Sequence, residues 1–320
     1  MQVSIPPGLL KTIMPPVEAI DCQIPAACAG MRLDQALAEL LPAYSRSRLQ
    51  QALKAGHLCV DGQPRRPRDP VQGGEHVLGT LPREVETIAV AQAIPLTILY
   101  EDTELLVIDK PAGLVAHPAA GNRDGTLVNA LLHHAPELAT LPRAGLVHRL
   151  DKDTSGLLVV ARSLRAHTAL VAQLQARRIE RYYLAVVNGL PVAGGSVDAP
   201  VGRHPVDRQR MAVTPGGKPA VTHYRIQQRF RGHSLLQVKL DTGRTHQIRV
   251  HMAHIGHPVL GDPVYGRKTK WERAHEELLC GQCLHAKSLE LIHPKTGEQM
   301  HFDSPLPDYF TETVRLLKNE

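Results

Sequence analysis

Short runs of apolar and β-branched residues recur along the chain from Leu96 onward, and Gly and Pro separate them. Such runs predict β-strands, because branched side chains pack well on a pleated surface. The predicted strands cover residues 96–100, 105–109, 157–161, 182–188, 221–227, 235–240 and 289–292. Helices are predicted at 126–133, at 164–178 and from Thr245 onward. The pattern therefore predicts an α+β domain with a large, mostly antiparallel mixed sheet and flanking helices and loops.

Length and composition divide the chain into four predicted parts. A chain of 320 residues is long enough for about two domains, each with its own core. Residues 1–16 contain four prolines, which predicts a flexible tail. We expect a small module at 17–82, a linker at 83–95 and the large domain at 96–320.

The small module begins with an amphipathic pattern. Leucine and alanine recur at helical spacing from Leu33 to Leu41, and Pro42 should end this helix. Ser45 can cap a second helix, which Gly56 should end. Residues 57–62 then predict the start of a β-hairpin with an Asp-Gly turn. The order helix, helix, hairpin with basic outer positions is typical of a small RNA-binding unit.

Positive charge is concentrated in this module. The whole chain has a formal net charge of +6 and a sequence pI near 9.1, which suits a polyanionic partner without proving one. Between residues 43 and 69, two aspartates accompany six cations, which are Arg46, Arg48, Lys54, Arg65, Arg66 and Arg68. An isolated charge usually marks a solvated face, but a cluster this one-sided favours binding to nucleic acid.

Several classes of protein are not expected. No run of about 18 apolar residues predicts a membrane span, and the N-terminus lacks the pattern of a secretory signal. We therefore expect a cytoplasmic protein. Cys280 and Cys283 resemble half a zinc site with His285 close by, but no second ligand pair has matching spacing. Reduced thiols and no metal are expected.

The segment Gly145–Val160 places a charged cluster between two apolar runs. This pattern predicts a strand, a tight loop with His148, Arg149 and Asp151, and a second strand. Loops held by a rigid scaffold are common places for catalytic residues. A carboxylate beside a fixed cation is ionised at neutral pH, so Asp151 could act as a nucleophile or a base. The alternative is a structural ion pair, which spacing alone leaves open.

Two further clusters could complete such a site. After a predicted strand, a Gly turn leads into a helix region with Arg244 and Arg249, which could pair with Asp151 or with phosphate. Elsewhere, the adjacent Tyr182 and Tyr183 must face opposite sides of a predicted strand. One of them could stack on a nucleic-acid base, and the sequence alone does not select which.

These motifs resemble the signature of the RluA-type pseudouridine synthases. The resemblance rests on Gly145–Asp151 with Thr154–Gly156, and it continues through further motifs in family order. These are Lys110–Pro118, Gly125–Leu131, Gly217–Thr222, Thr242–Met252, Gly261–Gly266, Leu284–Pro294 and Ser304–Pro307. Residues 17–80 are similar to the RNA-binding module of ribosomal small-subunit protein four. The combination resembles the RluD-like subgroup, which acts on large-subunit ribosomal RNA.

The resemblance implies the pseudouridine synthase fold and an enzyme that isomerises uridine in RNA without cofactor or metal. It places Asp151 at the position of the catalytic aspartate and Arg249 at that of the arginine paired with it. Tyr183 matches a tyrosine that stacks on the target base and can act as a base late in the reaction. Arg149 resembles a residue that holds the RNA strand after the uridine has been flipped out. Arg244 and the basic module should contact RNA, and the resemblance leaves open which atom Asp151 attacks.

Two other functions fit parts of the sequence. A ribosome-assembly factor that binds RNA without essential catalysis would need only the basic module. A metal-dependent hydrolase could use His148 and Asp151, but no second ligand cluster is visible. The expected partner is ribosomal RNA of the large subunit or its assembly precursor, and the expected state is a monomer.

Overall fold

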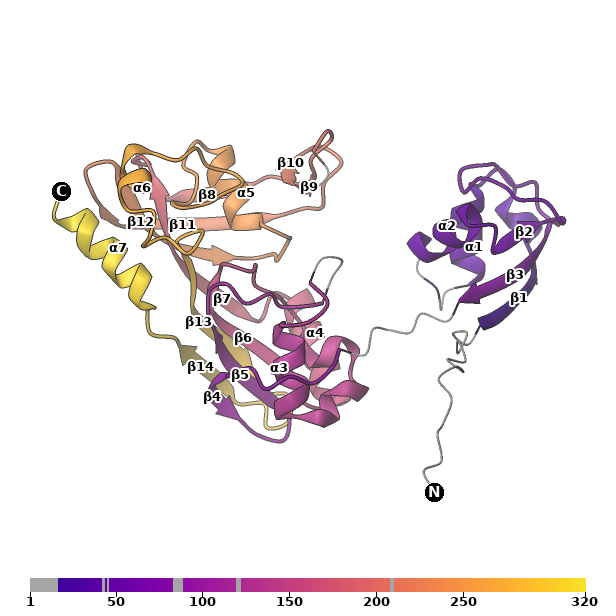
Figure 1. The fold of residues 1–320 in the computed structure, drawn as a ribbon, viewed down its shortest axis with the longest axis horizontal. Coiled ribbons are helices and arrows are strands. Elements are labelled where there is room, and N and C mark those ends of the chain that lie inside the picture. The colour runs from indigo at the N-terminus through magenta and orange to yellow at the C-terminus, as the bar shows by residue number, and fades with distance from the viewer. Residues whose placement is uncertain (1–16, 42–43, 45, 83–88, 119–121, 208–209) are drawn as a thin grey trace, which may run out of the picture. The chain divides into compact units, whose positions relative to one another are not determined.

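The computed structural model describes residues 17–41, 44, 46–82, 89–118, 122–207 and 210–320. The chain divides into two compact units, Met1–Thr87 and Ile88–Glu320 (Figure 1). The predicted tail, Pro42, Ser45 and the first part of the predicted linker lie outside the described residues. The rest of that linker runs along the large unit, where the Gln92 backbone N–H donates to Asn129 O at 3.0 Å.

The N-terminal unit combines a three-stranded antiparallel sheet with two helices (Figure 1). The strands lie in the order β1 (Val17–Gln23), β3 (His76–Pro82) and β2 (Leu58–Val60). The helices are α1 (Leu33–Leu40) and α2 (Arg46–Lys54). Leu33, Leu37 and Leu49 are fully buried in one core with residues of the sheet. The two predicted helices are therefore present, each with its apolar positions turned inward.

The predicted Asp-Gly turn forms, with Asp61 at φ 50° and Gly62 at φ 74°. The residues on either side of this turn form only an isolated antiparallel bridge, between Val60 and Gln63, and not a longer hairpin. The strand that pairs with β2 begins later, at His76, because the intervening residues include three prolines that cannot donate to a strand ladder.

The large unit is built on a nine-stranded mixed sheet. Its main path is β4 (Thr97–Glu101), β5 (Leu105–Lys110), β6 (Ser155–Ala161), β13 (Leu284–Ile292), β7 (Glu180–Asn188), β12 (His233–Leu240), β11 (Val221–Arg229) and β8 (Gly195–Asp198), and β14 (Gln299–Asp303) pairs with β13. All neighbouring strands are antiparallel except β6 and β13. The predicted mostly antiparallel mixed sheet is confirmed. The sequence did not predict β8, β14 or the separate ribbon of β9 (Val201–Arg203) and β10 (Met211–Val213).

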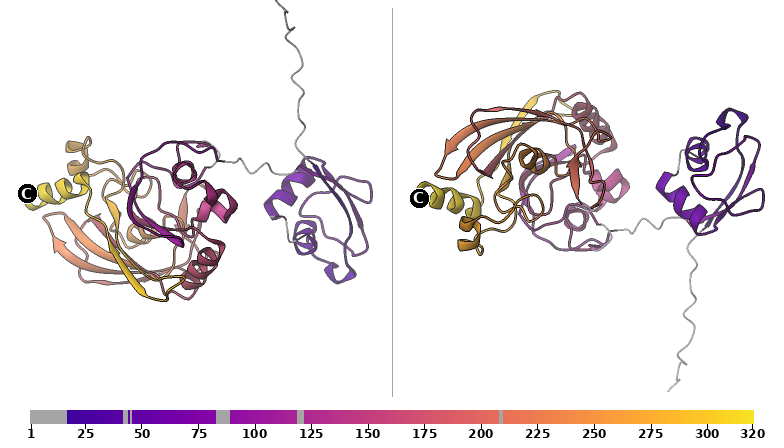
Figure 2. Two further views of the ribbon diagram at one scale, coloured as in Figure 1. Left: turned by 90° about the horizontal axis from the view of Figure 1, so that it is seen from below. Right: turned by 90° about the horizontal axis from the view of Figure 1, so that it is seen from above.

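Helices cover both faces of this sheet. On one face, α3 (Leu127–His134) and α5 (Gln247–His254) share a core with Tyr183 and Ala185 of β7. On the other face, α6 (Lys270–Ala274) and α7 (Asp308–Lys318) share a core with Leu184 and Val186. The helix α4 (Leu164–Gln175) covers the face of β5 and β6 that is turned away from α3. Figure 2 shows α7 at the periphery of this unit, beside α6.

Candidate active site

The charged loop lies between a short 3-10 segment at Pro142–Gly145 and β6. The prediction of a strand in its apolar lead-in is wrong, because Leu146 forms only a single bridge with Val160. Gly145 has φ +78°, and a Cβ at this position would lie 2.0 Å from Ala161 O. This left-handed, closely packed backbone interrupts the extended run and turns the chain into the loop.

A buried lysine holds the loop in place. Lys110 at the end of β5 is 1% exposed, and its ammonium donates to the carbonyls of Pro111 (2.8 Å), Leu114 (2.9 Å) and Lys152 (2.9 Å). Burial lowers the pKa of Lys110 to about 8. Because Lys152 directly follows Asp151, Lys110 fixes the backbone that presents this carboxylate. Sequence reasoning missed this role, since a Lys-Pro pair does not reveal which carbonyls will surround it.

Asp151 belongs to a chain of two ion pairs that runs through Arg249 on α5. Arg249 Nη1 donates to Asp151 Oδ2 at 3.1 Å, so the structure brings these two predicted residues together. The other edge of the guanidinium donates to Asp262, from Nε at 2.7 Å and from Nη2 at 2.9 Å. Burial disfavours the charge of Arg249, but the two carboxylates raise its pKa above the ordinary value. Arg249 is therefore a permanent cation in contact with the Asp151 carboxylate.

Asp262 is a partner that sequence reasoning did not single out. Its side chain is fully buried, and Oδ1 also accepts the backbone N–H groups of Val264 and Tyr265 at 2.9 and 3.1 Å. The turn at 261–266 therefore orients the carboxylate that holds Arg249. An aspartate in a Gly-Asp-Pro turn is common, so only the contact with Arg249 reveals its part in the site.

His246 and Tyr265 lie on the other side of the Asp151 carboxylate. His246 precedes α5 with a left-handed backbone (φ 56°), and its Nε2 lies 3.8 Å from Asp151 Oδ1. Its Nδ1 lies 2.8 Å from Tyr265 Oη. Burial lowers the pKa of His246, although Asp151 opposes this shift, so the imidazole is neutral at neutral pH. The Arg249 guanidinium lies 5.1 Å from the centre of the Tyr265 ring, which helps to fix its plane.

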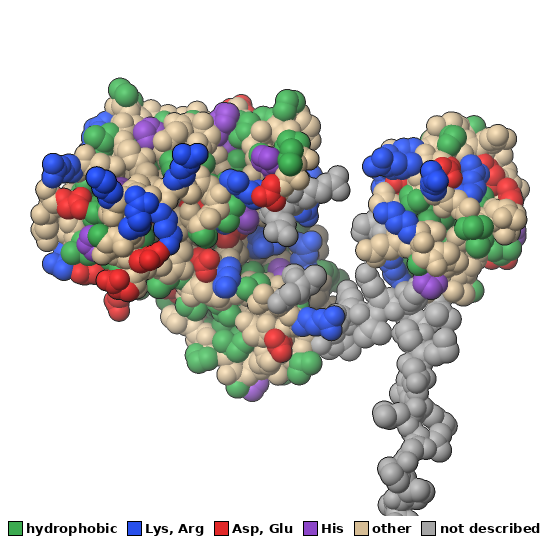
Figure 3. Space-filling view, turned by 45° about the horizontal axis from the view of Figure 1, so that its top comes forward, with side chains coloured by type: hydrophobic (Ala, Val, Ile, Leu, Met, Phe, Trp, Pro, Cys, Tyr) green, Lys and Arg blue, Asp and Glu red, His purple; other side chains and the backbone are tan. Residues whose placement is uncertain are grey.

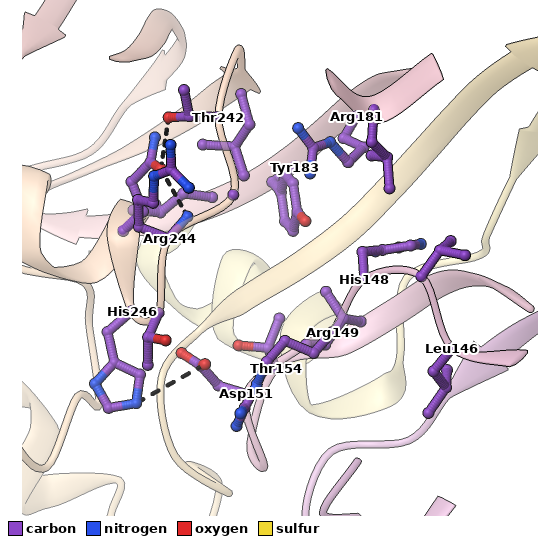
Figure 4. Close-up of a pocket in the computed structure, with 18 of the residues that line it drawn as sticks. Leu146, His148, Arg149, Asp151, Thr154, Arg181, Tyr183, Thr242, Arg244 and His246 are labelled. Carbon is purple, nitrogen blue, oxygen red and sulfur yellow. Dashed lines mark hydrogen bonds and ion pairs between the residues drawn. The ribbon is translucent and has the colours of Figure 1, made fainter. Parts of the chain in front are cut away.

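Tyr183 faces the same pocket from β7. Strand alternation places Tyr182 on the opposite side, where its hydroxyl donates to Glu180 at 2.5 Å. Tyr183 is 5% exposed, and its hydroxyl has no hydrogen-bond partner among the residues that the structure describes. Burial raises the pKa of Tyr183, so the phenol is protonated at neutral pH. In Figure 4 its hydroxyl end points toward the loop with Arg149 and Asp151.

Asp151, Tyr183, His246 and Arg249 line one pocket of about 810 Å³ within the large unit (Figure 4). A pocket of this size can hold a nucleotide-sized ligand. Its lining contains two carboxylates, Asp151 and Asp241, and six guanidinium groups. The arginines are Arg143, Arg149, Arg177, Arg181, Arg244 and Arg249. An excess of positive charge in a partly enclosed site attracts an anionic ligand.

The two arginines predicted to bind RNA near Asp151 are held differently. Arg149 is exposed and forms no hydrogen bond or ion pair with any residue in the described part of the chain. Arg244 is half-buried, and its Nε donates to Pro219 O at 3.1 Å. The Arg149 side chain is therefore free to move into contact with a ligand, whereas Arg244 has only its terminal nitrogens available for one.

His148 is used by the scaffold. Its Nε2 accepts the backbone N–H of Val159 at 3.1 Å, and burial together with the positive charge of Arg181 lowers its pKa to about 3. A neutral ring with this nitrogen occupied is a poor general base. Within the described ranges, no group of three His, Cys, Asp or Glu side chains could hold a metal ion. The same ranges contain no helix long and apolar enough to cross a membrane.

Known proteins share both units of this chain. A profile of the family described as RNA pseudouridylate synthase matches residues 104–254, and a profile of the S4 domain matches residues 31–77. A protein of Pseudomonas aeruginosa named Ribosomal large subunit pseudouridine synthase D is 54% identical over 305 residues, covering 93% of this chain and 95% of that protein. The chain belongs to the RNA pseudouridylate synthase family.

Further members of the family agree. A protein of the same name from Escherichia coli (strain K12) is 50% identical over 297 residues, covering 90% of this chain and 91% of that protein. The solved structure of Human RNA Pseudouridylate Synthase Domain Containing 4 has a TM-score of 0.57 at 24% identity, covering 69% of this chain and 93% of that chain. The predicted family and the predicted pseudouridine synthase fold are confirmed.

In the S4 part of this synthase, two of the predicted RNA-binding cations are bound within their own unit. Arg46 donates from Nε and Nη2 to Asp34 Oδ2 at 3.1 and 3.0 Å. Arg65 donates to Pro70 O at 2.7 Å and lies 3.5 Å from Glu75 Oε1. Spacing alone could not show these contacts, because the partners come from other segments of the chain.

The other cations of the cluster point to solvent or rest on an aromatic ring. The Arg48 guanidinium lies 4.7 Å from the centre of the Tyr44 ring. Lys54, Arg66 and Arg68 are exposed. Figure 3 shows Lys and Arg side chains grouped on the surface of the N-terminal unit. Exposed cations of this kind can contact phosphate without loss of a structural partner.

Proposed function

We propose that this synthase isomerises specific uridines to pseudouridine in large-subunit (23S) ribosomal RNA. The observation that carries the proposal is the Asp151 carboxylate, bound by Arg249 in an arginine-lined pocket that Tyr183 also faces. The names of the similar proteins from P. aeruginosa and E. coli support this RNA as the substrate. A stacked uridine must first be flipped out of the RNA, at a cost of a few kcal/mol.

The reaction exchanges one bond of the uracil for another. The bond from C1′ to N1 breaks, the base turns, and C1′ bonds to C5 while C5 loses a proton and N1 gains one. Nothing is oxidised or reduced, so the chemistry needs no cofactor or metal. We assign Asp151 as the reacting group. Three roles fit it: attack on the sugar, attack on the base, and removal of a sugar proton. Each requires a carboxylate oxygen of Asp151 that the contact with Arg249 leaves available.

Tyr183 has the position to stack on the flipped base. Its ring faces the pocket, and stacking of an aromatic ring on a base contributes roughly 1–3 kcal/mol. Action as a base would require prior loss of the phenol proton, which burial disfavours. Stacking needs no such step, and it is the role we assign to Tyr183 once the uridine has been flipped into the pocket.

Cations outside the reacting group hold the RNA. The exposed Arg149 is free to support the strand that the flipped uridine has left. Arg244 can offer its terminal nitrogens to phosphate. In the S4 unit, Lys54 and Arg66 are assigned to phosphate contacts, which add affinity without reading sequence. Arg48 belongs to the same surface, while Arg46 and Arg65 contribute charge as well as structural contacts.

We further propose that the protein acts as a monomer in the cytoplasm, during ribosome biogenesis. A single chain supplies Asp151, Tyr183 and Arg249 to the pocket, which supports catalysis by a monomer. Light scattering of the purified protein, alone and with RNA, checks the monomer. A stable dimer whose disruption abolishes activity would contradict it.

The test of the proposed function compares Asp151→Asn with Asp153→Asn, which changes another aspartate of the same loop. Asp153 is not among the pocket-lining residues. Pseudouridines in ribosomal RNA from cells with each variant are mapped by carbodiimide-dependent primer extension. We expect loss of the signal in Asp151→Asn with RNA binding intact, and retention in Asp153→Asn. Persistence of the signal in Asp151→Asn would contradict the assignment.

The same strains test the alternative of an RNA-binding assembly factor without essential catalysis. Under that alternative, Asp151→Asn would fully replace the native protein in growth and ribosome assembly. Under our proposal, Asp151→Asn abolishes pseudouridine formation in the ribosomal RNA, whether or not the protein also assists ribosome assembly.

A further inference from the structure

Arg181 is a buried cation for which the reaction above provides no use. The residue is 7% exposed, and its Nε is shielded from solvent without a hydrogen-bond partner. No ion pair connects its guanidinium to any residue in the described ranges. A buried charge without a partner opposes folding, because the desolvation of the ion is not offset. Such a group is retained at a functional site when its partner arrives with a ligand.

The position of Arg181 puts this group in the pocket. It lies on β7 two residues before Tyr183, so both side chains leave the same face of the strand. Figure 4 shows the guanidinium beside the Tyr183 ring. Gly243 leaves room for it, since a Cβ at that position would lie 2.8 Å from Arg181 Nη1. A glycine here keeps the terminal nitrogens free to meet a ligand.

The carboxylates of the pocket do not neutralise Arg181. Asp151 is bound by Arg249 at 3.1 Å, and Asp241 lies 3.2 Å from His223 and 3.5 Å from Arg177. The remaining charges of the lining are further arginines. The counter-ion of Arg181 must therefore come from outside the described part of the protein.

We propose that Arg181 binds a phosphate next to the target uridine, which rests on the proposed function. Each nucleotide brings a phosphate, and the guanidinium fork matches two phosphate oxygens. A uracil carbonyl could accept a hydrogen bond but would leave the charge uncompensated. Since Arg181 is 7% exposed and its Nε is already shielded from solvent, phosphate binding requires little further desolvation of the guanidinium. The contact would hold the backbone beside Tyr183 while the base turns.

The test is a double-mutant cycle between protein and RNA. Hairpins contain the target uridine with either normal phosphodiesters or one neutral methylphosphonate, on its 5′ or its 3′ side. Every hairpin, including the normal one, has 2′-fluoro sugars at the nucleotides that precede the two varied linkages. The hairpins then differ only in the charge of one linkage. The values of kcat/KM for wild type and Arg181→Met are compared, and Arg178→Met serves as a control because Arg178 is exposed and is not among the pocket-lining residues.

We expect Arg181→Met to lower kcat/KM by roughly 10- to 100-fold on the normal hairpin, as for loss of hydrogen bonds from a charged donor. At one of the two positions, the methylphosphonate should lower kcat/KM of the wild type by a similar factor. The same methylphosphonate should lower kcat/KM of Arg181→Met little further. The control should show independent, multiplicative losses. Multiplicative losses for Arg181→Met at both positions would overturn the proposal and favour a contact with the uracil.

Two further results separate the possible failures. If the wild type forms no pseudouridine in any hairpin or in ribosomal RNA, the proposed function fails; if it does and the cycle shows no coupling, only the inference fails. A purely structural arginine would lower the melting temperature when replaced. We expect Arg181→Met to melt at the same or a higher temperature than the wild type without RNA, because an unpaired buried charge is removed. A clearly lower melting temperature would count against an unpaired Arg181.

Discussion

Two aspartates, one in each unit, show how a similar ion pair can serve structure or chemistry. Asp34 of the S4 unit is fully buried, and three side chains of its own unit donate to it. These donors are Arg32, Arg46 and Gln50. Asp151 is 15% exposed and receives one side-chain hydrogen bond, from Arg249. A carboxylate with every oxygen engaged stabilises a fold, whereas one with an oxygen left toward a pocket can react.

The arginines differ in the same way. Arg46 keeps 41% of its side chain exposed while it binds Asp34. Arg249 is 5% exposed at its side chain and depends on Asp262 for most of its hydrogen bonds. If Asp34 is removed, water can therefore hydrate Arg46, whereas water cannot reach Arg249 to replace Asp262.

Removal of the structural carboxylates should separate the two networks most strongly. Asp262→Ala leaves Arg249 as a buried, half-paired cation, so we expect the large unit to lose about 3–5 kcal/mol of unfolding free energy and isomerisation to be lost. Asp34→Ala leaves exposed arginines, so the S4 unit should lose only about 1–2 kcal/mol and catalysis should persist at saturating RNA. Urea unfolding and single-turnover assays measure both. Equal destabilisation of the two units would break the comparison.

The loop under Asp151 should add a pH dependence above pH 8, where the Asp34 network of the S4 unit has none because the pKa of Asp34 is lowered. Lys110 has a pKa of about 8 in the folded protein, below the ordinary 10.5, so the unfolded chain binds more protons between these values. Stability therefore rises with pH in this window. Relative to Lys110→Met, the unfolding free energy of the native protein should increase by roughly 3 kcal/mol between pH 8 and 10.5. Denaturation across this range measures the difference, and a flat or falling difference would contradict the burial of a charged lysine.

The stacking role of Tyr183 predicts a smaller effect. Tyr183→Phe retains the ring and should keep most activity, whereas Tyr183→Ala should lose roughly 1–3 kcal/mol of transition-state stabilisation. Tyr182→Ala on the opposite face is the matched control and should affect kcat/KM less. If Tyr183→Phe is as inactive as Tyr183→Ala, the hydroxyl and not the ring is essential, and the assignment to stacking fails.

The exposed cations of the S4 unit should have the smallest effect. Lys54→Ala or Arg66→Ala should raise KM several-fold and leave kcat unchanged. Each should also reduce the slope of log K against log salt by about 1, since one phosphate contact is lost. Titrations of RNA at several salt concentrations provide the slope. An unchanged slope would show that the substituted residue does not contact phosphate.

The sequence predicted strands and candidate residues better than it predicted partners. Branched, apolar runs such as 157–161 have a strong local preference for strand structure. The short, polar β8 has no such preference. Asp151 and Arg249 were found because each sits beside a turn signal and a charged cluster. Asp262 was missed because its function comes from meeting Arg249 in space.

Three positions show why contacts need the fold. Local alternation separates Tyr182 from Tyr183, but only the packing of α3 and α5 against one face of β7 shows which one faces the pocket. Arg46 has the pattern of an RNA contact, yet a carboxylate twelve residues earlier binds it. Arg181 has an ordinary place in a strand, and only its burial without a partner marks it.

The most direct test of the account follows the hydrogen that leaves C5 of the target uridine. Ribosomal RNA labelled with tritium at C5 of uridine is incubated with wild type, Asp151→Asn or Asp153→Asn in stoichiometric amounts. The account predicts rapid tritium release by wild type and Asp153→Asn, and no release by Asp151→Asn despite unchanged binding of the RNA. Release by Asp151→Asn at the wild-type rate would show that the open carboxylate is not the reacting group.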